Sequence, residues 1–143
     1  MRTAIACLIA FFFTLQMPGQ TNSTTAPPIL REAVMPRYPP IAAAAHVTGK
    51  VTVEVTVKNG SVVNTSVLPK PDAPAGRRLL ESPTVENLRT WKFDSQVAGT
   101  FTVTYTYLIS GTETDAPTNA RIEILPSLDV LLTARPVKPT ITY

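Results

Sequence analysis

The stretch Val51-Thr52-Val53-Glu54-Val55-Thr56-Val57-Lys58-Asn59-Gly60-Ser61-Val62 decides the fold. Its four odd-numbered valines up to Val57 alternate with polar residues, which is the two-residue period of a strand with one buried face. Asn59-Gly60 then predicts a two-residue turn, because both turn positions need a positive φ that these residue types tolerate. A second alternating strand follows over residues 62–68. We therefore expect an antiparallel hairpin.

The residues after the hairpin predict a helix and a third strand. Leu80, Thr84, Leu88 and Trp91 recur at the spacing of one helical face, and Pro83 suits only a first turn, so we expect a helix over 81–90. Phe101, Val103, Tyr105, Tyr107 and Ile109 alternate with other residues and predict a strand. Packing the helix stripe, with Trp91 as its anchor, against the apolar face of the sheet gives a two-layer α+β fold.

Outside this region the chain predicts shorter elements. Early prolines and a run of alanines favour a short helix over 40–46. The apolar stretches 122–125 and 128–133 predict one or two extra strands. We expect a signal peptide over 1–20, a Thr/Pro-rich linker over 21–35, the main domain over 36–109 and a C-terminal extension over 110–143. The predicted sheet is antiparallel, has three or more strands, and packs against one main helix.

Composition excludes several classes of function. The 143 residues suit one domain, and 44 % hydrophobic residues can form a core. A net charge of +3 without a basic cluster argues against nucleic-acid binding. Cys7 is the only cysteine and His46 the only histidine, and the chain has no phosphate loop, nucleophile elbow or metal-ligand spacing. We therefore predict no enzyme activity, no catalytic residue, no metal or cofactor, and no small-molecule substrate.

The N-terminus predicts export. Arg2 precedes an apolar run over 4–15, and Pro18-Gly19-Gln20 breaks it, which is the order of a secretory signal peptide. The run is shorter than the roughly 20 residues that span a bilayer. We expect cleavage after Gly19 or Gln20, with an uncleaved inner-membrane anchor as the alternative.

Several pieces together resemble the C-terminal domain of TonB, the energy transducer of the Gram-negative envelope. The resemblance covers about residues 36–109, and its order of short helix, hairpin, helix and strand agrees with the elements predicted above. The pieces are Pro36-Arg37-Tyr38-Pro39, Gly49 to Val57, Asn59-Gly60-Ser61-Val62, Asn87-Leu88-Arg89-Thr90-Trp91-Lys92-Phe93 and the strand over 100–108.

The resemblance implies a periplasmic module that binds outer-membrane transporters. In the family, a segment of the transporter adds as a strand to an edge of the domain's sheet, so main-chain hydrogen bonds supply much of the affinity. Asn59, Gly60, Leu88 and Trp91 are expected to be structural. The partner-binding residues that the resemblance implies are Tyr38, Pro39, Phe101, Val103, Tyr105 and Tyr107.

The C-terminal extension leaves alternatives open. A tethered strand has a high effective concentration, so residues 121–125 and 128–133 could extend the sheet within the same chain and block the partner edge. They could also pair at the opposite edge and leave that site open. The alternative function is a stand-alone secreted structural or interaction domain that keeps the fold without energy coupling. A homodimer is a further option.

Overall fold

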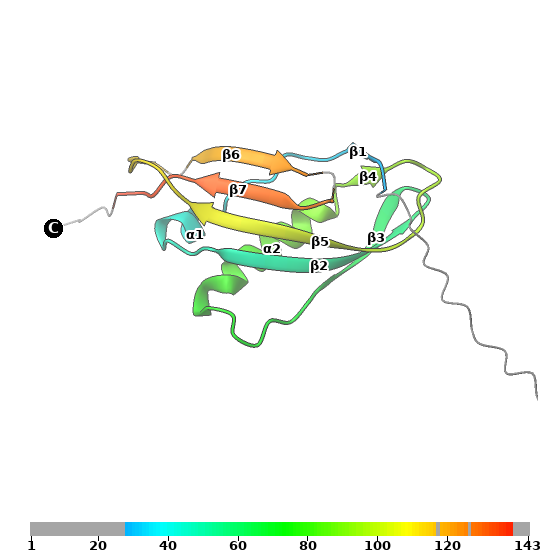
Figure 1. Ribbon diagram of the computed structural model, residues 1–143, viewed down its shortest axis with the longest axis horizontal. Helices are drawn as coiled ribbons and strands as arrows, with labels where there is room; N and C mark the ends of the chain where they lie inside the picture. Colours follow the sequence, from blue (N-terminus) through cyan, green and yellow to red (C-terminus); the bar gives the residue numbers. More distant parts are fainter. Residues whose placement is uncertain (1–27, 117, 126, 139–143) are drawn as a thin grey trace, which may run out of the picture.

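A computed structural model describes residues 28–116, 118–125 and 127–138. It is an α+β fold in which one seven-stranded sheet packs against a main helix (Figure 1). The strand order is β1-β4-β3-β2-β5-β7-β6. The elements are β1 Leu30–Glu32, α1 Pro40–Ala44, β2 Gly49–Lys58, β3 Ser61–Val67, a 3-10 turn Ala75–Arg77, α2 Arg78–Leu88, β4 Lys92–Phe93, β5 Gly99–Ile109, β6 Asn119–Ile124 and β7 Val130–Ala134.

The predicted hairpin is confirmed as β2 and β3. Asn59 and Gly60 have φ values of 50° and 75°, and Lys58 pairs with Ser61 across the turn. This is the left-handed turn that lets two strands continue with their natural twist. Farther along, the pairing shifts by one residue, which leaves Val63 as a bulge between the partners of Thr56 and Val57.

The valine face of β2 is the centre of the core. Its four valines at 51, 53, 55 and 57 are at most 1 % exposed. β5 pairs antiparallel with β2 from Gly49↔Tyr107 to Val57↔Gly99 and adds Val103, Tyr105 and Tyr107 to the same buried face. The third predicted strand is thus confirmed.

The helix begins earlier than its sequence predicts. It runs over Arg78–Leu88, so Pro83 lies inside it and the expectation that Pro83 sits in the first turn is wrong. The proline leaves the carbonyl of Leu79 without its helical donor, but Leu79 is an exposed residue where water can replace that donor. The expected stripe is confirmed, because Leu80, Thr84 and Leu88 are buried.

The C-terminal extension supplies both extra strands, and it corrects the prediction of an antiparallel sheet. β7 pairs parallel with β5 over Tyr105–Ile109, and β6 pairs antiparallel with β7 (Figure 1). The reason is topological: the chain first builds the outer strand β6 and then returns as β7, which therefore runs in the direction of β5. Leu128, Val130, Leu132 and Ala134 are at most 5 % exposed, so the extension completes the core.

The N-terminal side also differs from its prediction. Leu30–Glu32, within the stretch expected as a linker, forms β1 and pairs with β4. The expected signal peptide and its cleavage point lie outside the described residues. Among those residues, no helix has the length and hydropathy to cross a membrane.

Gly60 gives a direct test of the hairpin. A Cβ atom there would lie 2.6 Å from the carbonyl oxygen of Phe93, and φ is 75°. Gly111 is a matched control, because its φ is 97° but the nearest atom to a Cβ is 4.0 Å away. We expect Gly111→Ala to lose about 1–2 kcal/mol of unfolding free energy from backbone strain alone. Gly60→Ala should lose more in urea denaturation, and equal losses would contradict the close approach.

Trp91 tests the packing of the two layers. It is 1 % exposed and lies against Phe93 and Tyr105. We expect Trp91→Ala to cost about 3–5 kcal/mol of unfolding free energy, because the lost contacts leave a cavity. Trp91→Phe should cost less, since it keeps part of the ring. A loss below about 1 kcal/mol for the alanine variant would mean that the ring contributes little to the core.

Candidate functional site

Tyr38 and Pro39 lie together at the start of α1, and the tyrosine is a core residue. Its ring is 4 % exposed and meets the ring of Tyr107 edge-on, with 5.2 Å between centroids. The Tyr38 hydroxyl donates a hydrogen bond to the carbonyl of Val47. Pro39 is partly exposed and precedes the first helical residue. The structure therefore places Tyr38 beside β5 through its side chain, inside the protein.

The four candidate residues of β5 divide into two pairs by backbone environment. Val103, Tyr105 and Tyr107 have buried side chains and Phe101 is partly buried. β7 runs beside Tyr105 and Tyr107 on the side away from β2, in a parallel ladder. Phe101 and Val103 precede this parallel ladder, which begins at Tyr105. Hence β7 occupies the edge of one half of the predicted binding strand, and only the half over 99–104 lies outside that ladder.

A polar network under the tyrosines was not predicted from the sequence. Asn87 Oδ1 accepts hydrogen bonds from the Tyr105 hydroxyl at 2.6 Å and from Trp91 Nε1 at 3.2 Å. The Thr84 and Tyr107 hydroxyls share a hydrogen bond of 2.8 Å. The signal in the sequence was a polar residue at 84 in an apolar helix stripe, which needs a partner when buried. The network fixes α2 against β5.

The outer edge of β3 is largely open among the described residues. β4 pairs with β3 only at Ser61↔Lys92. On the side of β3 that faces β2, the Leu68 amide donates a hydrogen bond to the carbonyl of Thr52. Every second residue is hydrogen-bonded in this way, so the backbone groups of Ser66 and Asn64 also point toward β2. Because antiparallel strands alternate, the backbone N–H and C=O groups of Thr65 and Val67 point to the outer edge. These groups form a template for an added strand.

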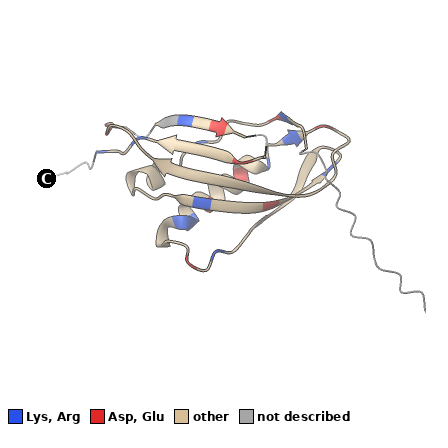
Figure 2. Cartoon of the chain, viewed as in Figure 1, with Lys and Arg blue, Asp and Glu red and all other residues tan. Residues whose placement is uncertain are grey.

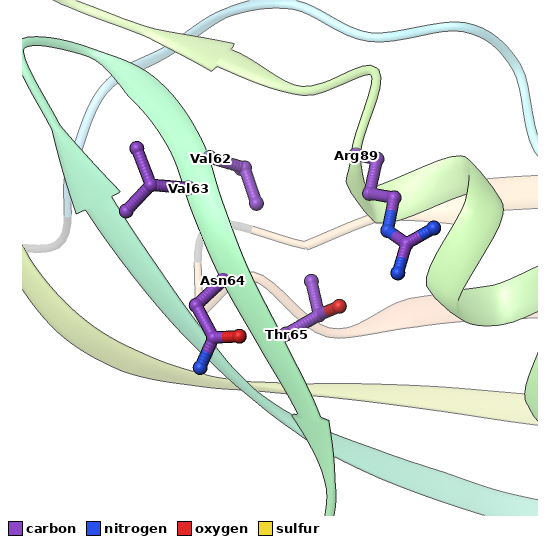
Figure 3. Close-up of a pocket in the computed structure, with 5 residues that line it drawn as sticks. All are labelled: Val62, Val63, Asn64, Thr65 and Arg89. Carbon is purple, nitrogen blue, oxygen red and sulfur yellow. The ribbon is translucent and has the colours of Figure 1, made fainter.

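A groove with one charged residue lies beside this edge. A cavity of about 260 Å³ is lined by Val62, Val63, Asn64, Thr65 and Arg89. Figure 3 shows Arg89 extending from the end of α2 toward the side chains of Val62 and Thr65, while Val63 and Asn64 point away from the helix. In the part of the chain that the structure describes, none of the ion pairs includes Arg89. The groove thus offers strand-pairing groups together with a positive charge.

Comparison with protein families gives one match, which covers more than half of the chain. Residues 34–110 match the family described as Gram-negative bacterial TonB protein C-terminal. The chain belongs to this family. A search of curated proteins found no match to the chain. The TonB C-terminal family is a transport and interaction domain of the Gram-negative envelope, not a family of enzymes.

The family region and the extension divide the sheet. Residues 34–110 of the TonB C-terminal match include both helices and the strands β2, β3, β4 and β5, whereas β6 and β7 lie beyond it. Of the two added strands, β7 pairs directly with β5, the last strand of the family region, and β6 pairs with β7. In this sheet, β7 therefore covers part of the β5 edge, and β6 forms the outer edge on that side.

Burial of the aromatic cluster changes its acid–base chemistry. Burial, together with the nearby Tyr107 phenol, raises the pKa of Tyr38 to about 12. Burial raises the pKa of Tyr107 to about 12, although its hydrogen bond to Thr84 opposes the shift. The pKa of Tyr105 is also raised, mainly by burial. All three phenols are therefore held in their neutral form while the domain is folded.

These shifts predict how stability depends on pH. Folding holds the three pKa values above the ordinary value of about 10, so the unfolded chain releases these protons first as the pH rises. Their contribution to the unfolding free energy is complete below about pH 10 and is lost as the pH rises toward about 12. Urea denaturation at several pH values measures this loss of unfolding free energy. In the Tyr38→Phe and Tyr107→Phe variants the unfolding free energy should fall less steeply with pH, because each lacks one of the phenols. Tyrosinate absorbance that rises near pH 10 for these phenols in the folded protein would contradict it.

Proposed function

We propose that this chain is a periplasmic TonB-like module that binds extended segments of outer-membrane transporters by strand addition. The family match over residues 34–110 is the observation that carries the proposal. A sheet with open edges supports it, because main-chain groups on an edge can pair with an extended partner. Export by the predicted signal peptide would bring the module to the compartment where such segments are presented.

The first candidate position is the edge of β5, which the resemblance implies through Tyr38, Pro39, Phe101, Val103, Tyr105 and Tyr107. At Tyr105 and Tyr107, a partner strand would have to displace β7. Val130 and Leu132 of β7 are each 1 % exposed. Exposing both would cost about 3–6 kcal/mol, before the lost ladder is counted. A peptide with micromolar affinity gains only about 8 kcal/mol. Opening this half of the edge is therefore unfavourable, and a partner there is restricted to the half with Phe101 and Val103.

The groove of β3 is the better position for the partner. It needs no strand to be displaced, and the outward groups of Thr65 and Val67 are ready to pair. The positively charged guanidinium of Arg89 lines the groove beside this edge. We infer that the bound segment is extended, rich in β-branched residues, and carries a carboxylate that reaches the Arg89 guanidinium. Such charge-assisted hydrogen bonds are stronger than neutral ones.

A double-mutant cycle between the protein and a peptide tests this position. The probe is a labelled extended peptide with one aspartate among β-branched residues, and its matched form has asparagine in that place. Arg89→Ala in the full mature chain should weaken binding of the acidic peptide by about threefold or more in fluorescence anisotropy. The asparagine peptide should be affected much less by Arg89→Ala.

The matched control for Arg89 is Arg78→Ala, at the other end of the same helix, which should leave binding unchanged. Thr65→Pro should also abolish binding, because it removes an outward donor while the neighbouring pairs with β2 remain. Circular dichroism checks that this variant folds. If Arg89→Ala weakens both peptides equally, or Thr65→Pro binds normally, the groove is not the site.

A disulfide lock separates the two edges. Thr106 and Leu131 are neighbours in the β5–β7 register, so Thr106→Cys with Leu131→Cys would fix β7 on β5. The β3 position predicts unchanged peptide affinity in the oxidised form and after reduction. Affinity that appears only after reduction would assign binding to the β5 edge, with β7 as its gate.

The second candidate function is a stand-alone interaction domain without energy coupling. The observation that favours it is β7, which covers half of the edge that the family resemblance assigns to the transporter. Pulldown from an envelope fraction distinguishes the two functions. Recovery of outer-membrane transporters supports the TonB-like module, and their absence together with a folded, exported domain supports the alternative.

A further inference from the structure

The outermost strand of the extension has an edge of its own. β6 is the last strand in the sheet order, and its partner among the described strands is β7. The Leu125 amide donates to Asp129 O at 2.8 Å, in the same register as the β6–β7 ladder. Alternation therefore directs the backbone groups of Glu123 and Arg121 toward β7 and those of Ile122 and Ile124 toward the open side.

The side chains of β6 alternate as well. Ile122 and Ile124 lie opposite the buried Leu132 and Val130, on the core face of the sheet. Arg121 and Glu123 lie on the other face and form an ion pair with each other. Figure 2 shows the basic and the acidic residue following one another along this strand. Ile124 is 37 % exposed, so part of an apolar side chain is left uncovered at this edge of the sheet.

This pattern is self-complementary about a two-fold axis. We propose that two copies of the chain pair antiparallel through β6, with the axis at Ile122, and so join their sheets into one. The two Ile122 residues then exchange their outward hydrogen bonds. Arg121 of each copy lies opposite Glu123 of the other, in the non-hydrogen-bonded pair where Cα atoms are only about 4.5 Å apart. Opposite charges at such positions stabilise a sheet.

The charges also exclude the neighbouring registers. A shift by one residue would set outward groups against inward ones, so the hydrogen bonds could not form. A shift to the next allowed register in one direction places Arg121 opposite Arg121 of the other copy. The shift in the other direction places Glu123 opposite Glu123. Like charges directly opposite are destabilising, so the same two side chains that favour one register oppose its neighbours.

The apolar residues favour the same arrangement. In the proposed register, Ile122 packs beside Ile122 of the second copy on the core side of the joined sheet. Ile124 lies diagonally across from Ile122 of the second copy, which covers part of its exposed surface. Hydrogen bonding, charge and apolar contact therefore agree on one symmetric pairing, as a closed two-fold interface requires.

Charge reversal tests the pairing through the oligomeric state. Sedimentation equilibrium of the full mature chain should show a monomer–dimer equilibrium. Arg121→Glu alone, or Glu123→Arg alone, should weaken dimerisation by about tenfold or more, because each places like charges opposite each other. Arg121→Glu combined with Glu123→Arg in one chain should restore dimerisation.

Mixing the two single variants gives the sharpest result. Each is expected to dimerise more weakly than the parent when alone, but a chain with Arg121→Glu and a chain with Glu123→Arg present only opposite charges to one another. A heterodimer on mixing supports the pairing, since the ion pair within one chain cannot explain it.

Lys92→Glu is the matched control, because Lys92 pairs with Glu32 near the opposite edge of the sheet and should leave dimerisation unchanged. A monomeric parent chain at all concentrations, or singles that dimerise as well as the parent, would overturn the proposal. The proposal is independent of the strand-binding function, because Arg121→Glu should leave the affinity for the acidic peptide unchanged.

Discussion

The long antiparallel pairing of β2 with β5 is the constraint on which the rest of the structure depends. It runs over nine residue pairs and brings the four valines of β2 and the two tyrosines of β5 onto one face. That face determines where α2 packs, because Trp91 and the helix stripe need an apolar surface to cover. The pair also has two outer sides where further strands can be added. β3 pairs on the side of β2, and β7 pairs on the side of β5. Each candidate binding edge is therefore a consequence of how far these neighbours extend.

Local patterns made the main elements predictable. The alternation of the valines, the Asn59-Gly60 turn and the helix stripe each depend on residues close in sequence, and each appears in the structure. The early start of α2 does not follow from local sequence, because the helix propensity of Pro83 alone favours a first turn. Burial of Leu80, and the Thr84 hydroxyl donating to Leu80 O at 2.6 Å, favour a helix that includes the residues before it. Tertiary contacts outweigh local preference there.

Strand direction and short strands were beyond local reasoning. The apolar stretches 122–125 and 128–133 are similar and have the same period. The parallel orientation of β7 depends on which of them pairs with β5, and the period alone does not show this. β1 and β4 have three and two residues, too few to show a period, and they form because each lies beside an existing strand. For the candidate site, the resemblance pointed to Tyr38 and β5 as partner-binding, and the structure places the Tyr38 ring against Tyr107, but the resemblance could not show that β7 lies beside Tyr105 and Tyr107. Arg89 was visible in the sequence only as one residue of a longer motif.

The parallel docking of β7 also bears on when the domain can fold. Leu128, Val130, Leu132 and Ala134 close the core, yet they come after every other buried residue that the structure describes. The pairing of β7 with β5 joins residues remote in sequence, and such non-local pairings form slowly. During synthesis, the apolar face of β2 and β5 therefore stays incompletely covered until β7 has emerged. A chain of this design is expected to complete its folding late, after its C-terminal strands are available.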